Sequence, residues 1–337
     1  MTTRAETLAC RETPDATSPL LSVVVVNWNT RDVLADCLGS IRQHLAGVAH
    51  ETIVVDNGSS DGSPGMVTAE FPEMRLIALG ENLGFGRASN LGMVAARGAW
   101  LLLLNSDARL VDASLLALVD ALWQRPEAGV VGPRLVAENG HQQPSAHRFG
   151  SLARVAVEEL GLYKLLPRRR AEDLLLGGYW THGQERCVDW VTGACMLVRR
   201  EVFERTGGFD PAIFLYGEDE EWCRRVRAAG WSVVFSPAAT VVHAGHVTTH
   251  RFLGPADRIG RCLRAADDLV RREQGRIAAA AAAALRLTGA VLRLAFFAGR
   301  RLAGSDDARG CEARWLARTV LRHYGDGVRR ACRRRRA

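Results

Sequence analysis

Short apolar runs alternate with amphipathic stretches through the first third of the chain. Residues 20–27 form a β-branched apolar run, which is typical of a strand buried on both faces of a parallel sheet. Apolar residues then recur at helical spacing over 31–45. Further apolar runs at 52–55, 75–79 and 100–104 repeat the alternation. Strands and helices that alternate at these lengths predict βαβ units with right-handed crossovers, and hence an α/β fold.

The pattern is less regular beyond residue 105. Further helices are expected at 114–123, 201–207 and 218–229, and further strands within 187–199 and at 231–235. Residues 138–186 show no clear period, so we expect an irregular excursion over the active face there. Ligands of open α/β sheets bind beyond the carboxyl ends of strands. Polar clusters stand at such ends at 56–62 and 105–107.

The composition changes from residue 258 onward. Residues 258–337 hold 20 Arg against 7 acidic residues, whereas residues 1–257 hold 24 basic against 30 acidic residues. A basic tail favours phosphates, on lipid or on nucleic acid. The stretch 277–298 is rich in Ala, Leu and Phe but contains Arg286 and Arg293, which would be costly in a membrane-spanning helix.

Two interpretations of this stretch stay open. With Arg276 and Arg300, its two arginines recur every seven to ten residues and are expected near one helical face. The helix then lies in the lipid interface, with the arginine cluster at 333–336 near anionic headgroups. The alternative is a helix packed on protein and a solvated tail.

These observations predict three segments. Residues 1–19 are polar and are expected to be disordered, and they contain no apolar stretch typical of a secretory signal. An α/β domain is expected over 20–257, and a basic helical region, with membrane association as one interpretation, over 258–337. The eight cysteines include no C-x-x-C pair, which argues against a zinc finger or a disulfide framework and favours reduced, cytosolic thiols.

Two acidic residues stand at the ends of buried strands. Asp107 ends the run LLLLNSD, where a carboxylate can bind a hard divalent cation or simply form a turn or an N-cap. Asp56 opens DNGSSDG, where a carboxylate can accept hydrogen bonds from a base or a ribose. An Asx turn is the alternative there.

Other function classes lack their motifs. A nicotinamide-dependent dehydrogenase needs G-x-G-x-x-G after its first strand, whereas this first strand continues into NWNTRD, and no Walker A loop is present. A nucleic-acid-binding module is the alternative suggested by the tail, but the acidic remainder offers no basic stripe. A membrane-bound scaffold without activity is a further alternative. It would be expected to lack Asp107 or Asp219, an acid in the first turn of the helix expected at 218–229, and both are present.

Seven motifs occur in a fixed order over about residues 20–250: VVVNWN, VVDNGSSDGS, ENLGFGRASNLG, LLLLNSDA, DWVTGACMLVRR, GGFDPAIFLYGEDEEWCRRVRAAGW and VVHAGH. The set resembles glycosyltransferase family 2, an inverting group with the GT-A fold, in which a Rossmann-like mixed sheet binds a nucleotide-diphospho-sugar. Within that family the sequence is most similar to rhamnosyltransferase-like enzymes that use a dTDP-sugar. The resemblance implies a GT-A domain, here followed by the helical basic tail.

The resemblance also implies roles for polar residues in these motifs. Asn27 and Asp56 correspond to positions that hold the nucleoside. Asn82 and Asn90 correspond to the loop and the helix start that flank the nucleotide.

The motif at Asn105 to Asp107 matches the family's D-x-D position, with Asn in place of the first Asp. The resemblance therefore implies that Asp107 is the principal carboxylate for Mg²⁺ or Mn²⁺, with Asn105 beside the nucleotide-sugar. His243 corresponds to a further metal ligand. A histidine packed at a strand end is the alternative for His243.

Asp219 corresponds to the family's general base. Inversion by direct displacement needs one base for the acceptor hydroxyl and a stabilised leaving diphosphate. At the start of a predicted helix the anion of Asp219 is favoured by backbone N–H groups, although Glu218 and Asp219 could merely cap that helix. Trp190 and Glu218 are candidate contacts for the acceptor.

Together these features predict an inverting, metal-dependent glycosyltransferase that transfers L-rhamnose from dTDP-L-rhamnose to a lipid-linked or cell-surface glycan. A hexosyltransferase that uses a UDP- or GDP-sugar is the alternative within the family. The expected partners are the nucleotide-sugar donor, a polyprenyl-linked or glycan acceptor and an anionic membrane surface, with no nucleic acid. The expected location is cytoplasmic, peripheral to the inner face of the plasma membrane.

Overall fold

A computed structural model of the chain describes residues 19–245, 253–305 and 307–334, with side chains up to residue 326. Almost all of the segment 1–19 and the side chains of the arginine cluster at 333–336 lie outside this description, so the predictions made for them are not addressed.

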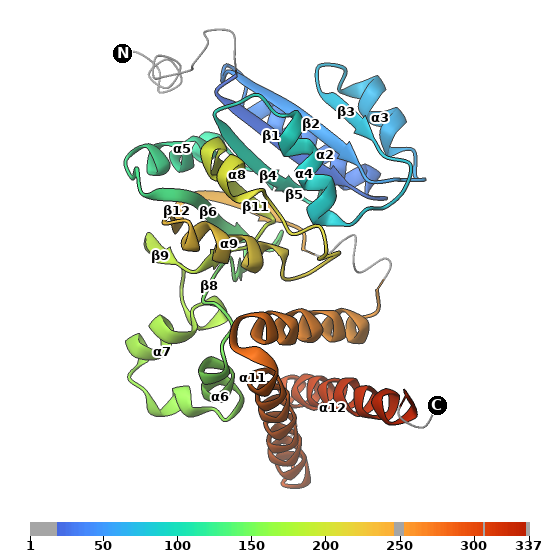
Figure 1. The fold of residues 1–337 in the computed structure, drawn as a ribbon, viewed down its shortest axis with the longest axis vertical. Helices are drawn as coiled ribbons and strands as arrows, with labels where there is room; N and C mark the ends of the chain where they lie inside the picture. The colour runs from blue at the N-terminus through green and yellow to red at the C-terminus, as the bar shows by residue number, and fades with distance from the viewer. Residues whose placement is uncertain (1–18, 246–252, 306, 335–337) are drawn as a thin grey trace. The chain divides into compact units, whose positions relative to one another are not determined.

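The chain divides into two compact units, each described here by itself (Figure 1). The first unit comprises Met1–Phe149 and Trp180–Arg251, and the second comprises Gly150–Tyr179 and Phe252–Ala337. The predicted domain boundaries, 20–257 and 258–337, stay predictions. The compact units differ from them chiefly in grouping Gly150–Tyr179 with the C-terminal helices.

A mixed sheet organises the first unit. Its strands are β1 (Leu21–Asn27), β2 (His50–Asp56), β3 (Arg75–Ala78), β4 (Trp100–Asn105), β5 (Ala108–Leu110), β6 (Ala128–Val136), β7 (Gln142–Gln143), β9 (Arg186–Val188), β11 (Cys195–Arg199) and β12 (Ser232–His243). The main path runs β3-β2-β1-β4-β11-β6-β12-β5. Strands β1 to β4 are parallel, whereas β11 lies antiparallel between β4 and β6. A separate ribbon pairs β8 (Ala146–His147) with β10 (Trp190–Val191).

Helices cover both faces of the parallel strands. The helices of this unit are α2 (Arg31–His44), α3 (Ser63–Glu70), α4 (Phe85–Ala95), α5 (Leu116–Trp123), α8 (Arg200–Thr206) and α9 (Glu218–Ala228). Alternate residues of β1 face opposite sides of the sheet, so Val23 and Val25 join the core cluster that contains α2 and α5. Val24 faces α4 instead, where Gly92 leaves no room for a Cβ against it.

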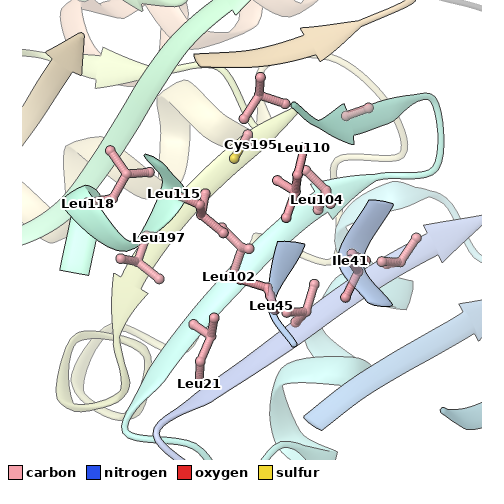
Figure 2. Close-up of a cluster of buried hydrophobic side chains, with 14 of the residues drawn as sticks. Leu21, Ile41, Leu45, Leu102, Leu104, Leu110, Leu115, Leu118, Cys195 and Leu197 are labelled. Carbon is pink, nitrogen blue, oxygen red and sulfur yellow. The ribbon is translucent and has the colours of Figure 1, made fainter. Parts of the chain in front are cut away.

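The main core forms where β4 meets α2, β5 and the 3₁₀ turn at Ala113–Leu115. Figure 2 shows Leu102 and Leu104 of β4 in one cluster with Ile41, Leu110 and Leu115. These five side chains are almost completely buried. Because apolar side chains fill the sheet faces, the polar residues of the motifs are left at the carboxyl ends of the strands.

The predicted strands and helices are found over most of the first unit, with two differences. The strand expected at 231–235 continues to His243 in β12, because a register irregularity between Ser236 and Thr240 carries the chain past Pro237. The irregular excursion expected over 138–186 is wrong in its middle part. Two helices form there, α6 (Leu152–Glu159) and α7 (Arg168–Leu175), and both belong to the second unit.

In the second unit, α6 and α7 accompany two long helices, α11 (Pro255–Leu302) and α12 (Ala308–Arg334). Helix α11 is interrupted at Gly275, whose φ of 87° lies outside the helical region. Small apolar clusters hold α6 against α11 and α11 against α12.

The four arginines of α11 that were expected near one helical face differ in exposure and pairing. Arg286 is buried and forms an ion pair with Asp267. Arg293 is partly buried and its Nη2 lies 2.6 Å from Oε2 of Glu159 in α6. Both cations are therefore neutralised inside the unit, and neither is presented with Arg276 at the surface.

Candidate active site

The carboxyl ends of β1 and β2 form a small polar cluster. Asn27, the last residue of β1, donates from Nδ2 to Oδ1 of Asp56 at 2.8 Å and to Oγ of Ser59 at 3.1 Å. The other carboxylate oxygen of Asp56 accepts from the backbone N–H of Ser59 at 2.9 Å. Both Asn27 and Asp56 are buried. An Asx turn was the alternative for Asp56, and the contacts show that the loop after β2 is held by these two side chains.

The loops that follow β2 and β3 are locked together by amides. Asn57 donates from Nδ2 to Oδ1 of Asn82 at 2.9 Å, and Oδ1 of Asn82 also accepts from the N–H of Gly84 at 2.9 Å. Asn90, on α4, makes two hydrogen bonds of 2.8 and 2.9 Å with the backbone of Phe209. Asn82 and Asn90 thus shape the walls of the site, and their predicted contact with a nucleotide stays a prediction.

The end of β4 joins this cluster through Thr30. Its Oγ1 donates to Oδ1 of Asn27 at 2.7 Å and lies 2.9 Å from Oγ of Ser106. On the other side of β4, the N–H of Asn105 donates to the carbonyl of Ala194 at 3.0 Å. The motif at 105–107 is therefore placed between the end of β1 and the turn that precedes β11.

Asp107 and His243 meet at the ends of β4 and β12. Nε2 of His243 lies 3.3 Å from Oδ1 of Asp107, and the two side chains are 9% and 7% exposed. The amide of Gln143 fixes the ring from the other side. Its Nε2 donates to the carbonyl of His243 at 2.9 Å, and its Oε1 lies 2.8 Å from Nδ1 of the ring. Since that oxygen can only accept, Nδ1 carries the proton when the ring is in its neutral form, and Nε2 then faces the carboxylate as a second acceptor.

Two acceptors face each other in this arrangement, which suits a cation. A protonated ring can satisfy the carboxylate, and so can a divalent ion bound by Oδ1 of Asp107 and Nε2 of His243. Within the described ranges, no group of three or more His, Cys, Asp or Glu side chains converges on one point. Mg²⁺ is usually held by only one or two carboxylates together with substrate phosphates, so a two-ligand site completed by a diphosphate fits this donor set.

Asp219 lies in the first turn of α9, after a strained loop. Tyr216 has a φ of 70° and Gly217 a φ of 91°, so the chain turns sharply before the helix begins. Oδ2 of Asp219 accepts from the N–H of Gly193 at 3.2 Å, and Oδ1 accepts from the N–H of Glu220 at 3.0 Å. The carboxylate is thereby placed beside the turn that leads through Ala194 to Asn105.

The acids at this helix start have perturbed pKa values. Burial raises the pKa of Asp219 to about 6, although its backbone hydrogen bonds with Gly193 and Glu220 act in the opposite direction. Burial and the neighbouring charge of Asp219 raise the pKa of Glu218 to about 8. Oε2 of Glu218 is buried and has no hydrogen-bond partner among the described residues. At pH 7 the pair therefore divides into an ionised Asp219 and a protonated Glu218.

Trp190 lies on β10 in the small second ribbon. Its ring stacks on His147 with a centroid distance of 4.0 Å and an interplanar angle of 17°. Its Nε1 donates to the carbonyl of Arg148 at 3.1 Å. The ring is therefore positioned by protein contacts on one face and one edge, and its predicted contact with an acceptor stays a prediction.

The structure connects the predicted residues through others that the sequence did not single out. Thr30 and Ser106 link Asn27 to the end of β4, Gly193 binds Asp219, and Gln143 orients His243. Gln143 and His243 are separated by 100 residues, so no local pattern could pair them. Gly193 lies within DWVTGACMLVRR, and its place in that motif is the available signal, because a Cβ there would meet Asp219 only at ordinary van der Waals distance.

Comparison with known proteins gives the family. The profile described as Glycosyltransferase like family 2 matches residues 18–267. The N-acetylglucosaminyl-diphospho-decaprenol L-rhamnosyltransferase of Mycobacterium tuberculosis is 36% identical over 208 residues, which are 57% of this chain and 65% of that protein. Rhamnosyltransferase WbbL of Escherichia coli is 39% identical over 71 residues, which are 21% of this chain and 27% of that protein.

A solved structure supports the fold. The mannosyltransferase PcManGT of Pyrobaculum calidifontis, in complex with GDP-Man and Mn²⁺, matches with a TM-score of 0.59 at 18% identity. The match covers 96% of this chain and 92% of that one. The predicted resemblance and the predicted fold are confirmed. The chain belongs to glycosyltransferase-like family 2, has the GT-A fold and is similar in sequence to rhamnosyltransferases.

Proposed function

We propose that this chain is an inverting glycosyltransferase that transfers L-rhamnose from dTDP-L-rhamnose to a lipid-linked glycan, with Mg²⁺ or Mn²⁺ as cofactor. The observation that carries the proposal is the placement of Asp219. Its carboxylate is held by the N–H of Gly193 next to the strand end that bears Asn105 and Asp107. The rhamnosyl donor and the lipid-linked acceptor rest on the similarity to the mycobacterial rhamnosyltransferase, of which this chain matches 65%.

The reaction requires one base. The acceptor hydroxyl loses its proton to Asp219 while its oxygen attacks the anomeric carbon from the face opposite the leaving group. The bond between that carbon and the diphosphate oxygen breaks, and the diphosphate leaves with the electron pair, so the configuration inverts. Asp219 suits this role because a pKa of about 6 leaves it ionised near neutral pH, yet more basic than an exposed aspartate.

The donor half of the site follows from the strand ends. Asn27 and Asp56 hold the loop on which a nucleoside would rest, and Asp107 with His243 would hold the divalent ion. When bound, that ion supplies Lewis-acid stabilisation of the leaving diphosphate. Gln143 holds the His243 ring with Nε2 directed toward Asp107, as a metal-binding histidine requires.

Membrane association of the second unit is part of the proposal. Within the described residues, α11 is long and apolar enough to cross a membrane by length and composition. All exposed residues of α11 between Ile277 and Gly299 are uncharged, namely Ile277, Ala280, Ala284, Thr288, Val291, Leu292, Ala295, Phe296 and Gly299. They recur every three or four positions and form one stripe about 35 Å long, which we name the apolar stripe of α11.

An orientation in the lipid interface fits this stripe better than a spanning one. The opposite face of α11 packs against α6 and α12. Arg286 forms an ion pair with Asp267 of the same helix, and Arg293 forms one with Glu159 of α6. A spanning orientation would take those charged helices into hydrocarbon. An exposed arginine lies just beyond each end of the stripe, Arg276 before it and Arg301 after it. Anionic headgroups would lie at these two positions.

A donor screen tests the catalytic part of the proposal. Thermal unfolding is measured with Mn²⁺ and dTDP-rhamnose, UDP-sugars or GDP-sugars, because a ligand that binds only the folded state raises the melting temperature. We expect stabilisation by dTDP-rhamnose and transfer to a polyprenyl-diphospho-N-acetylglucosamine. Asp107→Asn should lose the donor-dependent shift, whereas Asp219→Asn should retain it and lose transfer. Stabilisation by a UDP- or GDP-sugar alone would favour the alternative hexosyltransferase.

Vesicle flotation tests the membrane part. The full chain is expected to float with vesicles of phosphatidylglycerol and phosphatidylcholine, and less with phosphatidylcholine alone. Phe296→Glu, at a side chain that is 63% exposed, should reduce the bound fraction by about tenfold. Val94→Glu is the matched control, because Val94 is 72% exposed on α4 of the first unit. Equal loss in both variants, or in neither, contradicts a role for the stripe.

A further inference from the structure

The connection between α6 and α7 in the second unit leaves apolar side chains in solvent (Figure 1). Leu165 is 82% exposed and shares one face of a 3₁₀ helix, η2 (Leu162–Leu165), with Leu162, because residues three apart coincide in that helix type. Single exposed leucines are ordinary on a surface, but a group within one short segment indicates a contact with something apolar. We name residues 160–174 the basic leucine segment. Its exposed leucines are Leu160, Leu162, Leu165 and Leu174.

Basic residues are interleaved with these leucines. Lys164, the single lysine of the chain, precedes Leu165, and three arginines follow at 168–170. All four cations are exposed. Two acids are also present, namely Glu172, whose Oε1 lies 2.7 Å from Nε of Arg168, and Asp173. Four basic residues against these two acids give the segment a net charge of +2.

The arginines do not stabilise the helix on which they lie. Arg168, Arg169 and Arg170 open α7, whose first turn contains no acid. The N-terminus of a helix carries partial positive charge, so cations placed there lower the stability of the helix. Their position is better explained by an anionic surface outside the unit.

A pair of tyrosines accompanies the segment. The rings of Tyr163 and Tyr179 pack edge-on with a centroid distance of 4.8 Å, and Nζ of Lys164 lies 5.9 Å from the centroid of the Tyr163 ring. Tyrosine is enriched where a membrane meets water, because its ring is apolar and its hydroxyl is polar. Leucine, tyrosine, lysine and arginine therefore occur together here in a combination that a bilayer interface favours.

We propose that the basic leucine segment inserts Leu162 and Leu165 into the interface of an anionic bilayer, while its cations contact lipid phosphates. This inference rests on the membrane association proposed above and adds a second contact to the apolar stripe of α11. A partner with acidic groups alone would leave the leucines in water, and an apolar partner alone would bury the cations. A bilayer interface offers both environments within the length of one side chain. Stable attachment generally takes two such contacts, since each one by itself binds weakly.

Flotation of the full chain with vesicles tests the apolar part. Leu165→Glu should reduce the fraction bound to vesicles of phosphatidylglycerol and phosphatidylcholine by about tenfold. Val94→Glu, at a comparably exposed side chain of the first unit, should bind as the unaltered chain does. An unchanged melting temperature shows that each variant is folded.

Two further measurements isolate the charges and the location. Arg169→Gln combined with Arg170→Gln should weaken binding to phosphatidylglycerol vesicles by about fivefold for each charge removed, without effect on phosphatidylcholine alone. Arg75→Gln combined with Arg97→Gln, at exposed arginines of the first unit, should leave binding unchanged. Because the chain has one lysine, modification with an amine-reactive reagent and peptide mass spectrometry report on Lys164, which anionic vesicles should protect.

The outcomes separate this segment from the apolar stripe of α11. Loss of binding in Leu165→Glu supports the segment, whatever the result for Phe296→Glu. Loss in Phe296→Glu with unchanged binding in Leu165→Glu overturns the segment and retains the stripe. Equal loss in the control variants or an unprotected Lys164 also overturns it. Capture by poly-glutamate without binding to vesicles does so too, because an acidic partner would then suffice.

Discussion

The pH dependence of transfer provides a direct test of Asp219 as the base. A carboxylate can accept the proton of the acceptor only when it is ionised, so kcat/KM should rise as the pH increases through its pKa. Burial places that pKa at about 6 rather than the ordinary 3.8. At pH 5 only about a tenth of the enzyme then carries an ionised base, whereas an ordinary aspartate would be about nine-tenths ionised. Transfer at pH 5 should therefore be about tenfold slower than the plateau.

The assay measures kcat/KM for the proposed donor between pH 4.5 and pH 9, with Mn²⁺ in excess. Glu220→Gln is the informative variant, because the charge of Glu220 contributes to the raised pKa of Asp219. Its removal should move the acidic limb to lower pH. Asp219→Asn should reduce transfer on the plateau by about 10²–10⁴-fold, because an amide cannot accept the proton.

Loss of metal in acid must be separated from protonation of the base. Ligands must be deprotonated to bind a metal, so metal affinity itself falls as the pH falls. Loss of metal is reversed by a higher Mn²⁺ concentration, whereas protonation of Asp219 is not. A profile that stays flat down to pH 5, an acidic limb that disappears with more Mn²⁺, or substantial activity in Asp219→Asn would each refute the assignment.

Three further predictions concern neighbouring groups. Glu218→Gln should preserve transfer at pH 7, because the amide resembles the protonated acid in shape and charge. Transfer rates at pH 7 and pH 9 check this, and a large loss at pH 7 contradicts it. Gln143→Leu should weaken Mn²⁺ binding by about 10–100-fold, measured by electron paramagnetic resonance, whereas Gln142→Leu should not. Arg286→Met leaves the carboxylate of Asp267 without its cation and should lower the free energy of unfolding by about 3 kcal/mol. Calorimetry measures this, and an unchanged unfolding transition would show that the ion pair is not stabilising.

The sheet could be predicted because its signals are local. Each parallel strand is a β-branched or leucine-rich run, and burial on both faces requires that composition. The polar residues at the strand ends, Asn27, Asp56 and Asn105, were predicted for the same reason. Strands that are buried and apolar along their length can carry polar functional side chains only at their ends. The structure adds the contacts by which Thr30 joins these ends.

The features that sequence reasoning missed depend on contacts between distant residues. Arg286 and Arg293 looked like part of a basic face because the spacing of arginines gives no information on their partners, Asp267 and Glu159. Glu159 lies 134 residues from Arg293 in the sequence. It belongs to the stretch 138–186, in which we found no clear helical period. Gln143 and His243, which are separated by 100 residues, could not be paired from the sequence for the same reason.

The sequence GEDEE at the start of α9 is highly acidic, and a helix N-terminus by itself favours any anion placed there. The structure separates them by burial. Glu218 has a buried oxygen without a partner and keeps its proton at pH 7, while Asp219 has two backbone donors and ionises first. Two adjacent carboxyls in such surroundings cannot both carry charge at low cost. Burial and the charge of Asp219 together keep Glu218 protonated at pH 7, so Asp219 is the acid of this pair that can accept the proton.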